Sequence, residues 1–266
     1  MFSDITTHWI AIVGLLLVGL GLIAAVVIPY SRTRYTWAQA PFFLIHLIYT
    51  KIVWRGTISR PLPVKPGQGA IVVSNHVSPI DPAFIQLGMD EIVHWMVARE
   101  YSLNPYMAWV FRITKSIPVN RRGIDTAATK MAIRYAREGH VVGIFPEGHI
   151  NPHPEEKLLL PGRPGAALVA LKARVPLIPC YIKGAPYDGT AYGCFLMTAR
   201  TRCEVGDPID ISEYYGRENE REVLIAITER VMREIARLAG FPDYVPEMAG
   251  RKWNHEQFAP QQVPAQ

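Results

Sequence analysis

The chain has 266 residues, enough for one large α/β domain with an anchor and short tails. Hydrophobic residues make up 49% and charged residues 19%, with a mean hydropathy of +0.09 and a net charge of +5. These values exclude a disordered or collagen-like chain and favour a connection with a membrane, and three cysteines without a CxxC pair indicate ordinary thiols rather than a disulfide framework or a zinc ribbon.

The apolar excess is greatest at the start of the chain. Residues 9–28 form a run of 20 residues without a charge, long enough to cross a bilayer as a helix. The leading flank has no Lys or Arg, which favours an uncleaved anchor (residues 1–31) over a signal peptide or a buried helix. Five basic and no acidic residues lie between positions 29 and 60, so the positive-inside rule predicts a single-pass protein with its domain on the cytoplasmic face.

A second apolar stretch, residues 37–54, lies between two tryptophans and is interrupted by Gln39, His46 and Lys51. It is too polar for a confident second span. Its aromatic ends and its lysine suit a helix in the membrane interface, and a core helix of the domain is an equally good interpretation. Residues 32–60 are therefore expected to form a membrane-associated segment.

From Gly69 the pattern becomes that of an α/β domain, expected to extend over residues 61–240. Short β-branched runs predict strands over residues 70–74, 92–98, 141–145, 175–182 and 200–205. Helices are predicted from Asp125 to Arg137, from Pro164 to Ala173 and over residues 218–238. This alternation implies an α/β fold with a mixed sheet covered by helices. Residues 241–266, rich in Pro and Gln, are expected to be a loosely held tail.

The first chemical motif, NHVSPID, follows the first of these strands. Pro79 would enforce a turn that folds the carboxylate of Asp81 back toward the imidazole of His76. Such a pair is a general base and the group that orients it. In isolation, the same spacing more often reflects a surface histidine and an aspartate that caps a helix.

A second motif, GIFPEGH, ends another predicted strand at the edge of the sheet, where α/β proteins bind ligands. Glu147 could accept hydrogen bonds from a polyol, or it could be a solvated turn carboxylate. Between the two motifs, positions 112–137 hold seven basic residues against one acid, which suggests a phosphate ligand. Arg121 and Arg122 follow an apolar run that would hold them in place, and a guanidinium grips phosphate bidentately.

Together these segments resemble the glycerophospholipid acyltransferases, in particular the 1-acylglycerol-3-phosphate acyltransferases. Four blocks match the family's order, NHVSPID (75–81), SIPVNR (116–121), FPEG (145–148) and VPLIPCYI (175–182), and the resemblance covers about residues 70–210. It implies a glycerolipid acyltransferase-like fold in which His76 and Asp81 are the catalytic pair, Arg121 holds the acceptor's phosphate, and Glu147 and Gly148 line the acceptor site. Asn75, Arg122 and Arg163 complete the candidate substrate-binding residues. The chain departs from the family where His149 replaces the usual Thr, and where Ser116 and Pro118 replace a Gly and an aromatic residue.

The expected reaction is transfer of an acyl group from acyl-CoA or acyl-carrier protein to the sn-2 hydroxyl of 1-acylglycerol-3-phosphate, giving phosphatidate. Without a G-x-S-x-G elbow, direct attack of the acceptor hydroxyl on the thioester is preferred to an acyl-enzyme. His149 and His153, near Glu147, Glu155 and Glu156, resemble a metal cluster, but Pro152 and Pro154 disfavour the helix it would need; neither a metal nor another cofactor is expected. Nucleic acid is not an expected partner. The alternatives are an acyltransferase for another lysolipid, such as a lyso-aminolipid, and a non-catalytic lipid-binding membrane protein.

Overall fold

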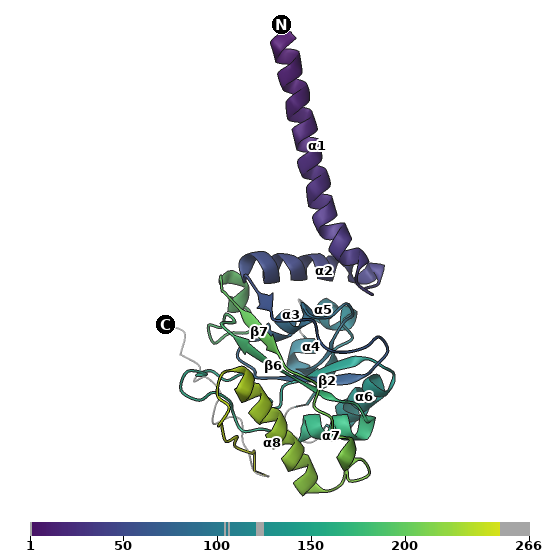
Figure 1. Ribbon diagram of the computed structural model, residues 1–266, viewed down its shortest axis with the longest axis vertical. Coiled ribbons are helices and arrows are strands. Elements are labelled where there is room, and N and C mark those ends of the chain that lie inside the picture. The colour runs from purple at the N-terminus through teal and green to yellow at the C-terminus, as the bar shows by residue number, and fades with distance from the viewer. Residues whose placement is uncertain (1, 104, 106, 121–124, 251–266) are drawn as a thin grey trace.

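The computed structural model describes residues 2–103, 105, 107–120 and 125–250. A long helix, α1 (Phe2–Ser31), projects away from an α/β domain, and α2 (Ala40–Leu47) lies across the top of that domain (Figure 1). The helical turns η1 (Trp37–Gln39) and η2 (Ile48–Val53) precede and continue α2. Within α1, residues 8–31 contain an 18-residue window with a mean hydropathy of 3.0 and no burial against the domain, so this segment is one candidate membrane span among the described residues.

The domain is built on a seven-stranded sheet with the order β1-β7-β6-β2-β5-β3-β4. Its members are β1 (Thr57–Ile58), β2 (Ala70–Ser74), β3 (His94–Ala98), β4 (Ile117–Val119), β5 (Val141–Ile144), β6 (Leu177–Lys183) and β7 (Arg202–Val205). All neighbours pair in parallel except β6 and β7, which are antiparallel. The prediction of a mixed sheet is confirmed.

Helices cover both faces of this sheet, and the alternating side chains of β2 show why. Ile71 and Val73 belong to the apolar cluster that includes the buried faces of α6 (Thr126–Arg137), α7 (Gly165–Ala173) and α8 (Arg221–Leu238). Ala70 and Val72 belong to a second cluster with Trp54 and with residues of α3 (Asp81–Gln86). A strand covered on both faces reads as a continuous apolar run, as this one does. Four shorter elements complete the chain: α4 (Arg99–Ser102), α5 (Ala108–Ile113), η3 (Gly193–Leu196) and η4 (Ser212–Tyr214).

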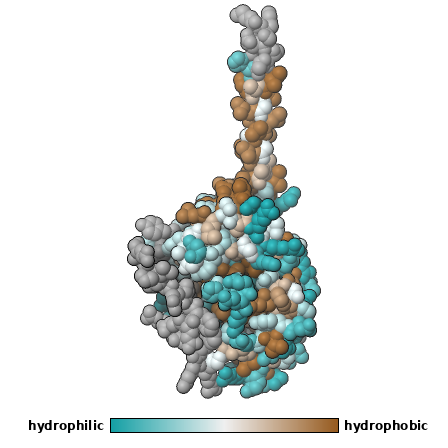
Figure 2. All heavy atoms as spheres, turned by 90° about the vertical axis from the view of Figure 1, so that its left-hand side faces the viewer, coloured by the Kyte–Doolittle hydropathy of each residue, from teal (hydrophilic) through white to brown (hydrophobic). Residues whose placement is uncertain are grey.

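The segment over residues 37–54 has two different faces. His46 and Phe43 of α2 are buried, and the ring Nε2 of His46 lies 2.7 Å from the carbonyl oxygen of Ala83 in α3. Ile45 and Ile52 point outward and are 43% and 70% exposed. Figure 2 shows hydrophobic side chains along α1 and at the top of the domain beneath it. One face of this segment therefore packs on the core, as the core-helix interpretation requires, and the other presents apolar side chains outward; the interfacial helix stays a prediction.

The segment after Gly240 differs from the expected loose tail over its described part. The amide of Gly162 donates to the carbonyl of Glu247 at 2.8 Å, and the amide of Ala249 donates to the carbonyl of Gly162 at 3.0 Å. Tyr244 and Met248 pack against the core cluster of α6, α7 and α8. The Pro and Gln content suggested a loose tail, but the side chains of Tyr244 and Met248 make apolar contacts that hold the backbone against the domain.

Candidate active site

The candidate residues meet at one edge of the sheet because β2, β5 and β6 run in parallel. Their carboxyl ends lead into the His76 turn, the Phe145 to Gly148 turn and the loop after Lys183. This edge is where open α/β sheets place their ligand sites.

His76 and Asp81 are in direct contact, as the sequence predicted. The ring Nδ1 of His76 lies 2.9 Å from Oδ2 of Asp81, and the same oxygen accepts hydrogen bonds from the amides of Val77 at 2.7 Å and Ser78 at 2.8 Å. Asp81 is fully buried, whereas the His76 side chain is 17% exposed. With Nδ1–H donating to Asp81, the lone pair is on Nε2, which is the arrangement of a general base.

An aromatic stack supports the imidazole from behind. The His76 ring lies flat on Phe145, with centroids 3.9 Å apart and planes 6° apart, and Phe145 stacks on Trp95 at 4.6 Å. Trp95 in turn lies against Gly143 of β5, where an added Cβ would come within 2.4 Å of the indole ring. No role for Phe145 or Trp95 was predicted from the sequence. The only available signal was a glycine inside a predicted strand, which often marks a close approach of another group.

Glu147 is placed differently from the prediction. The residue is 1% exposed, its Oε1 accepts the amide N–H of His76 at 2.8 Å, and its Oε2 accepts that of Leu160 at 2.6 Å. Burial raises the pKa of this carboxyl to about 8, against the lowering effect of the two hydrogen bonds. Its oxygens are thus engaged by backbone, so Glu147 holds the His76 turn instead of offering acceptors to a polyol.

The side chain of Asn75 bonds to the backbone of Ile182 and is not directed toward a substrate, contrary to the prediction. It is 1% exposed, its side-chain amide donates to the carbonyl of Ile182 at 2.8 Å, and its oxygen accepts the amide of Ile182 at 2.7 Å. These two bonds extend the pairing of β2 and β6 beyond the end of β2. They fix the backbone immediately before His76.

Gly148 and Arg163 lie together beside the stack. Gly148 has a φ of +72°, and a Cβ there would lie 3.3 Å from the Arg163 side chain. The amide of Arg163 donates to the carbonyl of Pro146 at 2.9 Å, and Arg163 and Phe145 both line a cavity of about 150 Å³ next to α6 and α7. The structure therefore brings one predicted cation to the site. Arg121 and Arg122 lie outside the described residues.

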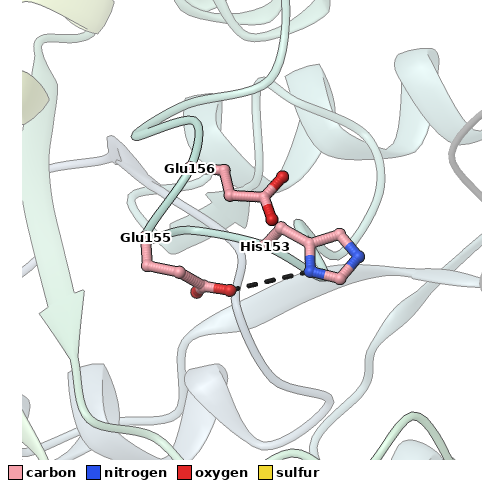
Figure 3. A group of neighbouring side chains, drawn as sticks. All are labelled: His153, Glu155 and Glu156. Atoms are coloured by element: carbon pink, nitrogen blue, oxygen red, sulfur yellow. Dashed lines mark ion pairs between the residues drawn. The ribbon is translucent and has the colours of Figure 1, made fainter.

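The five residues that resemble a metal cluster in the sequence do not form one group in the structure, and the half-buried His149 is not part of the exposed group. Glu147 is buried against the His76 turn, whereas His153, Glu155 and Glu156 lie on an exposed turn with their ligand atoms within 4.8 Å of one another (Figure 3). His153 Nδ1 and Glu155 Oε1 are 3.6 Å apart. Because all three side chains are exposed, we interpret them as a solvated polar turn.

Comparisons with known proteins support this interpretation of the fold. The sequence profile of the Acyltransferase family matches residues 55–183. A 1-acyl-sn-glycerol-3-phosphate acyltransferase of Bacillus subtilis (strain 168) is 24% identical over 172 residues, which are 64% of this chain and 81% of that protein. An N-acylphosphatidylethanolamine synthase of Arabidopsis thaliana is 33% identical over 102 residues, 35% of this chain and 34% of that protein.

Among solved structures, the 1-acyl-sn-glycerophosphate acyltransferase of Thermotoga maritima has the same fold. It superposes with a TM-score of 0.53 over 80% of this chain and 88% of that one, at 20% identity. The profile match includes His76, Asp81 and the Phe145 to Gly148 turn, so the residues that meet at the sheet edge lie within it. Residues 55–183 therefore resemble an acyltransferase domain, and the chain is similar over this part to acyltransferases that act on glycerophospholipids.

Proposed function

We propose that this protein transfers a fatty acyl group to the sn-2 hydroxyl of 1-acylglycerol-3-phosphate and so produces phosphatidate for phospholipid biosynthesis. The contact between His76 Nδ1 and Asp81 Oδ2 carries the proposal, because it leaves Nε2 to accept a proton from a hydroxyl. The Bacillus subtilis relative is named for this acceptor.

In the proposed reaction, Nε2 of His76 takes the proton of the acceptor hydroxyl as its oxygen attacks the thioester carbonyl. The new C–O bond forms, the C–S bond breaks, and the imidazolium returns the proton to the leaving thiolate. Asp81 stabilises the imidazolium and fixes its orientation. Arg163, whose side chain lies beside Gly148, is the proposed ligand of the acceptor's phosphate, and Arg121 and Arg122 are the other candidates.

The acyl donor is proposed to be acyl-CoA or an acyl-carrier protein. The basic excess of positions 112–137 suits either, since both carry phosphate and an acyl-carrier protein is acidic. The reaction needs no further cofactor, because a thioester is already activated for attack by a hydroxyl.

A second acceptor class has support from particular observations. His149 occupies the place where the family usually has Thr, and the Arabidopsis relative is named as an N-acylphosphatidylethanolamine synthase. Purified protein in detergent, supplied with one acyl thioester and a panel of lysolipids, tests both possibilities. Phosphatidate as the main product by mass spectrometry supports the proposal, whereas acylation of an amino-headgroup lysolipid in preference to lysophosphatidate refutes it.

We further propose that α1 anchors the chain in the bilayer, with the domain on the cytoplasmic face. The high hydropathy within residues 8–31 and the projection of α1 from the domain support this arrangement (Figure 1).

The full chain should resist extraction by alkaline carbonate. A chain beginning at Ser31 should bind anionic vesicles weakly and release them in high salt, since the exposed face of α2 and its flanking cations remain. Complete solubility of this shortened chain at low salt would contradict an interfacial role for residues 37–54.

A further inference from the structure

The loop between β6 and β7, residues 184–201, packs along the membrane-proximal turn η2. Trp54 donates its indole N–H to the carbonyl of Cys194 at 3.1 Å, and the ring of Phe195 meets Tyr49 of η2 edge to face at 5.4 Å. The amide of Ala199 donates to the carbonyl of Val53 at 3.4 Å. These contacts place η3 beside the end of the α2 segment, the green turn at its left end in Figure 1.

This loop presents apolar side chains on its outer side. Leu196 is 92% exposed and Tyr192 is 45% exposed, while Phe195 between them is turned inward against η2. Ile52 on the adjoining turn is 70% exposed. Single exposed leucines are common on protein surfaces, but here the exposed residues lie on a loop that packs on η2, next to the exposed Ile45 and Ile52 of the α2 segment.

Most of the charged side chains around these residues are basic. Lys51, Arg55 and Arg200 are all exposed, and Arg55 donates from Nε to the carbonyl of Ala199 at 3.1 Å. Asp188 is the only acid in residues 184–201, and its Oδ1 accepts the amide and hydroxyl of Thr190 at 3.0 and 2.8 Å within the loop. An apolar tip with a basic rim is complementary to a bilayer that carries anionic headgroups.

We propose that residues 184–201 form a second membrane-contact element, the docking loop, which inserts Leu196 into an anionic phospholipid bilayer beside the outer face of α2. The contact would hold the domain through two elements that are distant in the sequence and adjacent in the structure. The inference rests on the proposed membrane attachment and is independent of the acceptor's identity.

The docking loop also contacts the catalytic turn. The hydroxyl of Ser78 donates to the carbonyl of Pro186 at 2.6 Å, and the amide of Ser78 donates to Asp81. A loop held by the bilayer at Leu196 would therefore help to set the position of His76 and Asp81 relative to the lipid surface. This arrangement would bring the site to an acceptor that stays in the membrane.

A fluorescent reporter tests the insertion directly and needs no turnover. An environment-sensitive fluorophore is attached to Leu196→Cys in the full chain, which is reconstituted in nanodiscs with phosphatidylglycerol. The native Cys180, Cys194 and Cys203 are buried in the folded protein, and labelling of the wild-type chain measures their contribution. The matched control is Val245→Cys, since Val245 is 79% exposed on the segment after α8. A blue-shifted emission quenched by spin-labelled lipid only at position 196 is expected. Water-like emission at both positions would overturn the proposal.

Kinetics provide the second test. Leu196→Asp should raise the apparent KM for a membrane-borne acceptor by about tenfold, the effect of losing one buried leucine from an interface. It should leave the kinetics with a short-chain, water-soluble lysolipid unchanged, and Val245→Asp should change neither. An equal loss with both acceptors would show that Leu196 serves the fold instead of the membrane contact. If the fluorophore inserts but no lysolipid is acylated, the proposed function fails while the docking loop stands.

Discussion

Replacing Glu147 with glutamine separates a positioning role for this residue from a contact with the acceptor. Both carboxyl oxygens accept a backbone N–H, from His76 at 2.8 Å and from Leu160 at 2.6 Å. Glutamine offers only one acceptor oxygen, and its NH₂ would face the second N–H. One buried amide would lose its partner, at a cost of about 1–3 kcal/mol.

The same substitution changes how stability depends on pH. Burial raises the pKa of Glu147 from 4.5 to about 8, so the folded chain keeps this proton over a pH range in which the unfolded chain has released it. The free energy of unfolding of the wild type should therefore fall between pH 4.5 and 8 by at most about 1.4 kcal/mol per pH unit from this group. The glutamine of the Glu147→Gln variant cannot titrate, so the wild type's advantage in stability over the variant should shrink as pH rises.

Thermal unfolding followed by tryptophan fluorescence at pH 5.5, 7 and 8, with acyltransferase kinetics, measures these effects. Glu147→Gln should lower the melting temperature and kcat, because the His76 turn loses a support, and should leave the acceptor KM near its original value. Glu156→Gln, at an exposed carboxylate on a nearby turn, is the control and should change neither. A Glu147→Gln protein with normal kcat and a much higher acceptor KM would refute the reasoning and restore the predicted contact with the acceptor.

Three further predictions address the catalytic base, the phosphate site and the aromatic stack. His76→Ala should lower kcat by about 10² to 10⁴ with a normal circular dichroism spectrum, and more than a few per cent of residual activity would exclude it as the base. Comparing Arg163→Lys with Arg121→Lys should show which guanidinium binds the phosphate, because the substitution of that arginine should raise the acceptor KM much more than the donor KM. An unchanged acceptor KM in both variants would mean that another residue binds the phosphate. Gly143→Ala should lower stability by about 1–3 kcal/mol and shift the emission of Trp95, because its Cβ would overlap the indole; unchanged melting would mean that the stack relaxes freely.

The residues that could be predicted from sequence are those with a local pattern. The run AIVVS became β2 with the predicted bounds, because a strand covered on both faces is apolar throughout. Asp125 caps α6 by accepting the amide of Ala128 at 2.9 Å, and Gly139 has a φ of +89° just after the helix ends, as their residue types suggested. The approach of Asp81 to His76 followed from the turn between them.

Other features depend on contacts between distant segments and have no local pattern. Nothing in FPEG indicates whether Glu147 points toward solvent or toward the amides of His76 and Leu160, which lie in different parts of the sequence. The stack from Trp95 to His76 crosses from β3 over β5 to the turn after β2. Composition alone also failed to predict that the segment after Gly240 packs on the domain, because this packing depends on a few apolar side chains.

That segment affects how the chain can be shortened or tagged. Residues 247–249 bond to Gly162, the neighbour of Arg163, and Lys157 pairs with Glu247 at 2.8 Å. A protein cut at the end of α8 would keep every residue of the proposed catalytic machinery and still lose the backbone bonds that steady the arginine. A recombinant protein that ends after Ala249 would keep the hydrogen bonds between residues 247–249 and Gly162. A tag added after Ala249 would also leave these bonds in place.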